Sequence, residues 1–406
     1  MFKTNNISTR KILLPIGIIS MLFSGIIYAW SILKEPLAKE FGWGAEDLAL
    51  NFTLTMTFFC IGGFLGSQIT KKLGTQPTVI AAGLLTGLGF ILTGFSTGNI
   101  FLLYITYALM SGLGIGISYN VIISTINAWF PDKKGLCSGC LMMGFGASSL
   151  ILGKLAENMF NTANIGWKNT FILIGIVLGV VLIISGLFMK KPDTSVQFPT
   201  PKSVGKKHAE SFETKDYTTK EMLKRASFWQ AFLSLVCLTA VGSSVISFAK
   251  DLALSVGTAS DTATTLVGVL SIFNGLGRIL TGTLFDNIGR RKTMITANII
   301  TVFAAIVILI SVITNSVILC IAGLCLTGLS YGSSPTVSAA FTSTFYGSKH
   351  YQTNFSIMNF NLIFASFIAT LCSNILVASN GYTVPFILLT ALSAIAFILS
   401  ISIRRP

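Results

Sequence analysis

The sequence predicts an all-α polytopic membrane protein with twelve transmembrane helices in two six-helix bundles. Of its 406 residues, 52% are apolar and 10% are charged, and the charged fraction is far below that of a soluble globular domain. The mean hydropathy is +0.77, and long apolar stretches recur along the whole chain. With about 20 residues for each spanning helix and a loop after it, this length accommodates roughly twelve passes. A water-soluble fold is therefore excluded.

The apolar stretches that predict the helices follow one another from end to end. They cover residues 13–33, 48–70, 78–96, 100–128, 136–153, 169–189, 228–249, 262–284, 293–313, 316–341, 354–378 and 382–403. Each is long enough for a helix to cross the hydrocarbon core. No small-residue cleavage site follows the first stretch, so we expect a retained helix rather than a signal peptide. A single charge, Arg278, interrupts the eighth stretch, and none of the twelve contains Asp or Glu.

The distribution of basic residues predicts the orientation in the membrane. Most of the 28 Lys and Arg residues lie at the two termini and in the even-numbered loops. Cytoplasmic segments of membrane proteins carry such an excess. We therefore expect a multi-pass protein of the cell membrane with both termini in the cytoplasm.

A long polar segment divides the chain into two halves. It separates an N-terminal six-helix bundle, residues 1–189, from a C-terminal six-helix bundle, residues 227–406. The cytoplasmic linker between them, residues 190–226, has the low hydrophobicity and mixed charge of a flexible or surface-lying segment. A short amphipathic helix is expected near Thr218 to Arg225.

Several classes of protein are excluded by the residues that are present. The net charge of +14 does not indicate nucleic-acid binding, because Lys and Arg lie between apolar stretches and form no continuous basic domain. The seven cysteines lie in apolar stretches or at their ends, and Cys137-x-x-Cys140 has no second pair or histidine beside it. Both histidines, His208 and His350, fall in polar loops. We therefore expect no metal, no cofactor, no catalytic residues and no nucleic-acid partner.

A motif after the eighth stretch has a counterpart after the second. The two copies read Gly282-Thr-Leu-Phe-Asp286-Asn-Ile-Gly289-Arg290-Arg291-Lys292 and Ser67-Gln-Ile-Thr-Lys71-Lys72-Leu-Gly74-Thr75. The former resembles the G-x-x-x-D-(R/K)-x-G-R-R signature of the major facilitator superfamily, whose fold consists of two parallel six-helix halves. Gly282 would allow close helix approach, Asp286 would cap a neighbouring helix N-terminus, and the basic cluster would keep the loop cytoplasmic. In the first copy, Lys71 stands where the acid is expected.

A second motif, at the end of the fourth stretch, indicates a narrower family. Asn127-Ala-Trp129-Phe130-Pro131-Asp132-Lys133-Lys134-Gly135-Leu136 closely resembles the pattern N-x-W-F-P-D-K-(K/R)-G-L of the oxalate/formate antiporter family and the related monocarboxylate transporters. Tyr28-Ala-Trp30 with Pro36, and Phe273-Asn274-Gly275 ahead of Arg278, extend the resemblance. Taken alone, Trp129-Phe130-Pro131 would also serve as an interfacial aromatic anchor and a helix stop.

Arg278 carries most of the functional expectation. An ionised side chain within the hydrocarbon costs about 3 kcal/mol by insertion scales, so it should face a protein-lined cavity and an anionic partner. Because the apolar stretches contain no carboxylate, we expect the counter-ion to be a substrate carboxylate held in a bidentate pair. The alternative is that the side chain extends to the membrane interface. The resemblance favours substrate binding, because the helix-eight arginine of the family binds substrate carboxylate.

Two positions indicate which anion is carried. Asn274 lies one helical turn before Arg278, where it would orient the guanidinium or donate to the substrate. In animal monocarboxylate carriers the matching residue is an acid used for proton coupling, which an amide cannot replace. The resemblance to oxalate antiporters implies a second cation on helix eleven, and Leu362 stands at that place. A monoanion is therefore expected in preference to oxalate.

Other residues are candidates to complete the pocket. They are Tyr28 and Trp30 in the first helix, Tyr119 and Asn120 in the fourth, Tyr331 in the tenth and Asn361 in the eleventh. Tyr28 and Tyr331 match pocket-lining tyrosines of the family, whereas Thr327 replaces a family tryptophan. For each residue, ordinary helix packing is the competing interpretation.

Together these observations predict a monomeric secondary transporter of small organic monocarboxylates of the formate, lactate or pyruvate type. It would work by alternating access and anion exchange, with the substrate and the lipid bilayer as its partners. The alternatives are oxalate/formate or other dicarboxylate antiport, and a non-transporting sensor with a transporter fold. A cation-drug exporter would need a membrane acid, and an enzyme would need a nucleophile, base or metal constellation.

Overall fold

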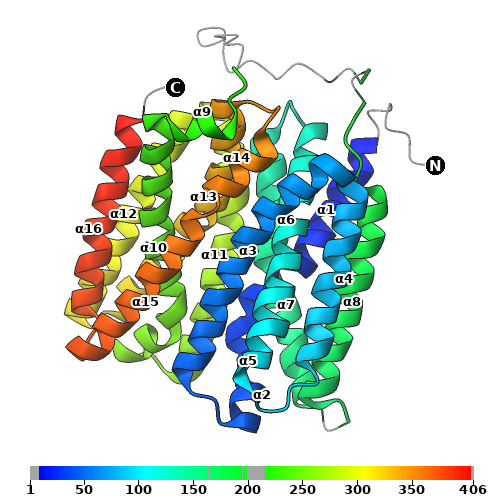
Figure 1. The fold of residues 1–406 in the computed structure, drawn as a ribbon. Coiled ribbons are helices and arrows are strands. Elements are labelled where there is room, and N and C mark those ends of the chain that lie inside the picture. The colour runs from blue at the N-terminus through cyan, green and yellow to red at the C-terminus, as the bar shows by residue number, and fades with distance from the viewer. Residues whose placement is uncertain (1–8, 163, 194, 197, 199–214, 404–406) are drawn as a thin grey trace. The chain divides into compact units, whose positions relative to one another are not determined.

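A computed structural model of the chain describes residues 9–162, 164–193, 195–196, 198 and 215–403 (Figure 1). Among these residues, twelve helical segments are long and apolar enough to cross a membrane, which confirms the predicted fold class and number of spans. They cover Thr9–Ala29, Leu50–Leu73, Thr75–Thr93, Ile100–Trp129, Gly135–Phe160, Gly166–Phe188, Ala226–Ser255, Thr265–Ile288, Arg290–Thr314, Val317–Tyr346, Tyr351–Leu376 and Thr383–Ser402. The predicted linker residues 199–214, with His208 among them, lie outside the described residues.

The chain divides into two compact units. The first comprises Met1–Asp132 and Gly144–Pro201, and the second comprises Lys133–Met143 and Lys202–Pro406. The fifth span therefore contributes its beginning to the second unit and the rest of its length to the first.

The first unit contains the helices of the first six spans. They are α1 (Thr9–Ser24), η1 (Gly25–Ala29), α2 (Trp30–Phe41), α3 (Ala45–Leu73), α4 (Thr75–Thr93), α5 (Ile100–Leu103), η2 (Tyr104–Ser111), α6 (Gly112–Trp129), the larger part of α7 (Lys134–Phe160) and α8 (Gly166–Phe188). The first span is not the uninterrupted helix of residues 13–33 that the sequence predicts, because η1 is a 3-10 segment. The helix α2 continues beyond residue 33 to Phe41, and Glu35, Lys39 and Glu40 are exposed along this polar end. In the fourth span, η2 is a π-helix, a form often found at functional positions.

The second unit contains the start of α7 and the helices of the last six spans. They are α9 (Thr219–Leu223), α10 (Ala226–Ser255), α11 (Ser260–Ile288), α12 (Arg290–Thr314), α13 (Val317–Tyr346), α14 (Tyr351–Met358), α15 (Asn361–Ser379) and α16 (Thr383–Ser402). The short helix α9 lies where the sequence predicts one. The eleventh span is broken between α14 and α15, whereas the sequence predicts one helix over 354–378. The Asn361 side chain donates a 2.6 Å hydrogen bond to the Met358 carbonyl, and such a bond competes with the helical pattern.

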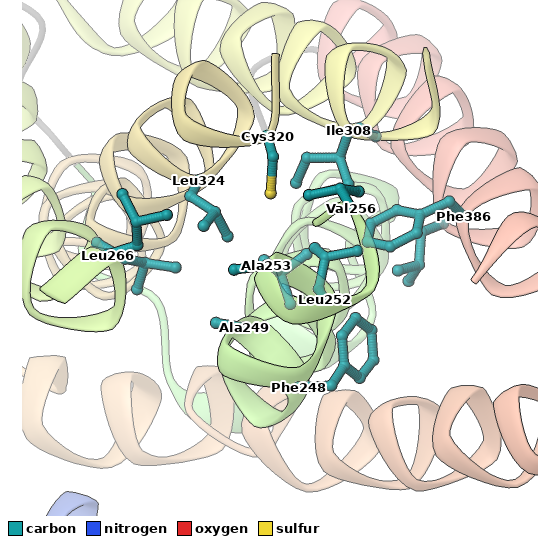
Figure 2. Packing of buried hydrophobic residues seen from close by; sticks show 14 of the residues in the cluster. Phe248, Ala249, Leu252, Ala253, Val256, Leu266, Ile308, Cys320, Leu324 and Phe386 are labelled. Atoms are coloured by element: carbon teal, nitrogen blue, oxygen red, sulfur yellow. The ribbon is translucent and has the colours of Figure 1, made fainter. Parts of the chain in front are cut away.

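The core of the second unit is apolar and is built around α10. Figure 2 shows Leu252 of this helix, and Val256 just after it, on the side of Ile308 of α12 and Phe386 of α16. The ring of Phe248 packs edge-on against Phe386 with centroids 5.8 Å apart. The helix is kinked at Phe248, where φ is −125° and ψ is 19°. These contacts hold the C-terminal end of α10. Its N-terminal end packs in a second apolar cluster that includes Met222 of α9.

Two helices continue past the apolar stretches that predict them. The helix α7 extends through Lys154 and Glu157, and α10 extends through Lys250 and Asp251. All four side chains are exposed. Hydropathy marks the membrane-buried part of each helix, and the helical backbone continues into the polar surroundings.

Large apolar side chains point outward along the spans. Phe101, Ile318 and Ile398 have 69%, 79% and 65% of their surface exposed. An exposed apolar surface of this kind matches a lipid environment rather than water. The lipid bilayer is therefore the medium that the spans require.

Candidate functional site

Arg278 lies on α11 and is almost completely buried, with 1% of its surface exposed. Its Nε donates a hydrogen bond to Oδ1 of Asn274 over 3.3 Å, and its Nη1 donates to the backbone carbonyl of Met142. Asn274 is thus placed to orient the guanidinium, as its spacing predicts. The burial argues against extension of Arg278 to the membrane interface, because a snorkelling side chain keeps its charged group in water.

The bond to Met142 gives Arg278 a neutral partner on another helix. Met142 belongs to the part of α7 that packs in the second unit. A backbone carbonyl has two lone pairs, so it can accept from a side chain while keeping its helical bond. Both acceptors of Arg278 are neutral, and among the described residues no carboxylate forms an ion pair with it. The charge is therefore hydrogen-bonded without being neutralised.

Neighbouring helices hold the backbone from which Arg278 projects. On α13, a Cβ added to Gly332 would lie 3.0 Å from the carbonyl carbon of Asn274 and 3.1 Å from the Arg278 nitrogen. One turn further along, the Thr336 hydroxyl donates to the Arg278 carbonyl over 3.4 Å. This close approach requires the absence of a side chain at Gly332. It fixes the position of α11 at the arginine.

The two remaining candidates of the second unit are buried beside α10. Tyr331 packs directly on Gly242 of α10 and has 9% of its surface exposed. The Asn361 amide donates to Met358, and its Oδ1 accepts from the Thr239 hydroxyl over 3.4 Å. These bonds hold the break between α14 and α15. For Asn361, the packing interpretation therefore has direct support from the structure.

In the first unit, two tyrosines meet at one phenylalanine. The rings of Tyr28 in η1 and Tyr119 on α6 each make an edge-on contact with Phe145 of α7, with ring centroids 5.2 Å and 5.0 Å apart. Asn120, next to Tyr119, is completely buried. Phe145 joins these candidates, although its apolar side chain gave no reason to select it from the sequence.

Trp30 has a different environment from Tyr28. Its indole N–H donates to the Leu48 carbonyl over 2.9 Å, and its ring packs on Tyr107 with centroids 4.6 Å apart. Because its single donor is already used, Trp30 contributes packing between α2, α3 and η2.

The predicted cap at Asp286 is confirmed. Its Oδ1 accepts from the Gly135 nitrogen over 3.0 Å, and its Oδ2 accepts from the Leu136 nitrogen over 2.8 Å. These two amides lie in the first turn of α7, where backbone N–H groups have no partner within the helix. A carboxylate at this end is also stabilised by the helix dipole. The predicted close approach of Gly282 is also present, because it packs against Gly135.

The basic residues of the two loop copies differ in their contacts. Arg290 donates to the Thr344 carbonyl over 3.3 Å, and its guanidinium lies 4.3 Å from the centre of the Phe345 ring. Arg291 donates to the Ile401 carbonyl over 3.2 Å, and Gly289 ends α11 with a positive φ of 79°. In the first copy, Lys71 and Lys72 are exposed, and Lys71 donates to Gln68 over 3.3 Å. The second copy therefore joins the start of α12 (Arg290–Thr314) to the ends of α13 and α16.

The motif at residues 127–136 fixes one end of the first unit. The indole of Trp129 donates to the Lys190 carbonyl over 2.8 Å. Asp132 accepts from Arg10 over 2.9 Å, and the Arg10 guanidinium lies 5.3 Å from the centre of the Phe130 ring. These contacts join the ends of α1, α6 and α8, so Trp129, Phe130 and Asp132 of the motif hold helices of the first unit together.

Over the part of the chain that the structure describes, twelve apolar spans and a buried cation with no ion-pair partner join the internal repeat of six plus six stretches. These features are those of a polytopic membrane carrier. The chain belongs to the Major Facilitator Superfamily, whose family pattern matches residues 13–250 and 234–406. Solved transporter structures agree with this fold. The proton:xylose symporter XylE covers 97% of this chain and 94% of its own with a TM-score of 0.73, at 12% sequence identity. The transporter FucP in its outward conformation has a TM-score of 0.70 at 13% identity, over 98% of this chain and 100% of its own.

Relatives by sequence narrow the comparison. The uncharacterized MFS-type transporter YhjX of Escherichia coli (strain K12) is 26% identical over 359 residues, which is 88% of this chain and 86% of the relative. The oxalate:formate antiporter of Oxalobacter formigenes is 26% identical over 292 residues, 72% of this chain and 67% of the relative. Monocarboxylate transporter 2 of Meriones unguiculatus is 30% identical over 200 residues, 47% of this chain and 40% of the relative. The protein is thus a transporter related to carriers of carboxylates.

Proposed function

We propose that this transporter carries small organic monocarboxylates, of the formate, lactate or pyruvate type, and that Arg278 binds the carboxylate. The supporting observation is a guanidinium with 1% exposure and two neutral acceptors, Asn274 and the Met142 carbonyl. Burying an unneutralised cation costs several kcal/mol, and an anionic ligand recovers much of that cost. A carboxylate matches the planar fork of arginine in a bidentate pair.

The same geometry supports exchange rather than net flux. In the empty carrier, Arg278 keeps hydrogen bonds but remains charged, because neither acceptor is an anion. Moving that charge through alternating access costs more without a counter-ion than with one. The loaded carrier should therefore return faster than the empty one. We propose that Arg278 meets each side in turn, in a monomer of the cell membrane with both termini in the cytoplasm.

Oxalate/formate antiport is the second candidate, because one relative of 26% identity is an oxalate:formate antiporter. The residue at the expected place of a second cation is Leu362, which follows the break of the eleventh span. A dianion paired with one arginine would keep a net negative charge in a surrounding of low dielectric. The monoanion therefore ranks first.

The test is uptake of radiolabelled formate, lactate, pyruvate and oxalate into proteoliposomes that contain the purified protein. Each carboxylate is measured in vesicles preloaded with the same unlabelled anion and in vesicles loaded with buffer alone. We expect faster uptake of a monocarboxylate in the preloaded vesicles. Absence of uptake for all four anions, with correctly inserted protein, would contradict the proposal.

A further inference from the structure

The last part of the linker is folded onto the turn between α13 and α14. Its described residues begin at Lys215, and Tyr217 donates its backbone N–H to the Tyr346 carbonyl over 3.0 Å. In return, Asn354 of α14 donates to the Tyr217 carbonyl over 2.9 Å and accepts from the Thr219 hydroxyl over 2.8 Å. In Figure 1, α9 and α14 lie at the same end of the second unit. The segment 215–225, called the linker brace below, is thus held by side chains and by backbone.

The linker brace also contributes to an apolar core. Met222 is completely buried, and Tyr217 has 6% of its surface exposed. The Tyr217 ring packs edge-on against Tyr346 with centroids 5.8 Å apart, and Arg225 lies 5.4 Å from the centre of the same ring. The helix α9 within the brace has a complete capping box, in which Thr218 and Glu221 satisfy each other's backbone N–H groups. These features are those of a folded part of the unit rather than of a passive tether.

Asp216 is the polar centre of this contact. Its Oδ1 accepts a hydrogen bond from the Lys349 backbone nitrogen over 2.9 Å. Gly347 lies beside it with a positive φ of 79°, and a Cβ there would approach the Asp216 Cα to 2.9 Å and meet its carboxylate. His350, the residue just before α14, makes no side-chain cap bond. The linker therefore supplies a carboxylate to the turn between α13 and α14, two residues before α14 begins.

The contact of Asp216 differs from the helix cap made by Asp286. Asp286 accepts from two amides in the first turn of α7, Gly135 and Leu136. Asp216 accepts from Lys349, which precedes His350, the N-cap residue of α14. The linker carboxylate therefore binds the turn that leads into the eleventh span.

We propose that Asp216 fixes the turn between α13 and α14, and that the linker brace thereby holds the beginning of the eleventh span in place. The brace holds α14 to the end of α13, while the break before Asn361 separates α14 from α15. Loss of the brace would release α14 without disturbing the buried Arg278. The linker brace is then a structural part of the second unit. Whether it is folded onto α14 affects how readily the eleventh span moves.

The test is amide hydrogen exchange, followed by mass spectrometry, on the full-length protein in detergent micelles. The variants are Asp216→Ala, the milder Asp216→Asn, and Gly347→Ala, which would displace the carboxylate. The matched control is Lys349→Ala, because it removes an exposed side chain and keeps the backbone donor. Loss of one such hydrogen bond, at about 1 kcal/mol, corresponds to about a five-fold change in local opening.

We expect exchange in residues 215–225 and 346–358 to become about five-fold faster in Asp216→Ala and unchanged in the control. In transport assays, turnover should change while the apparent KM for the substrate stays constant. Unchanged exchange in Asp216→Ala, or an equal change in Lys349→Ala, would overturn the proposal. The exchange readout needs no substrate, so it decides this question even if the proposed substrate is wrong.

Discussion

The cap that Asp286 places on α7 gives a prediction whose size follows from two hydrogen bonds. Replacement by alanine removes both carboxylate acceptors and leaves the Gly135 and Leu136 amides without them. Loss of an N-terminal cap costs about 1 kcal/mol, and loss of the charge that opposes the helix dipole adds about 0.3–1 kcal/mol. Asp286→Ala should therefore destabilise the start of α7 by about 1–2 kcal/mol. That corresponds to about a 5- to 30-fold rise in its local opening.

Hydrogen exchange of peptides from the first turns of α7 measures this opening directly. Asp286→Asn should have a smaller effect, because the amide keeps one acceptor oxygen and loses the charge. The control is Asn287→Ala, which changes the exposed next residue in the last turn of α11. Equal exchange in Asp286→Ala and the wild type would refute the reasoning, since it would mean that the two bonds contribute nothing to this helix start.

The remaining predictions concern the substrate, the coupling and the linker. Arg278→Ala and Arg278→Lys should abolish carboxylate transport while the melting temperature stays close to that of the wild type, and normal uptake by inserted Arg278→Ala would contradict this. Formate, lactate or pyruvate should compete for uptake better than oxalate, and Leu362→Lys should shift the preference toward the dianion in the same competition assay. A pH gradient should not drive accumulation in vesicles loaded with buffer alone, and strong accumulation that is lost on Glu35→Gln would identify a proton symporter. The hydrogen bonds from Thr218 hold the pKa of Glu221 below its usual range. The cap of α9 should therefore be intact above about pH 4.3 and weaken as the pH falls through the lowered pKa of the folded state. Amide exchange of peptides from this segment, with Glu221→Gln as reference, measures this change.

The architecture could be predicted from hydropathy, but the irregular places could not. Twelve runs of apolar residues report where the chain meets lipid, and the structure confirms that number among the described residues. The 3-10 segment at Gly25–Ala29 and the break before Asn361 leave hydropathy unchanged, because both lie within apolar surroundings. Such interruptions depend on individual side-chain bonds, for example that of Asn361 to Met358.

The candidate site could also be predicted from the sequence only in part. Arg278, Asn274 and Asp286 stand out because charge and amide groups are rare in an apolar chain. The structure pairs Arg278 with Asn274 and gives Asp286 two helix-start amides. The Met142 carbonyl could not be selected, since every residue carries one. The contacts of Asp216 were equally hidden, because a polar linker gives no sign of where it folds back.

The beginning of α7 has a consequence for biosynthesis. Gly135 leaves the ribosome well before Asp286, the residue that caps it 151 positions later. At about 5–20 residues per second, the interval lasts roughly 8–30 s. During that time the start of the fifth span has neither its carboxylate nor the surface of α11 against which Gly135 packs. In a newly synthesised first half, the start of α7 therefore lacks these contacts for that interval. Chaperones or proteases of the membrane-insertion machinery can act on this helix end during that time.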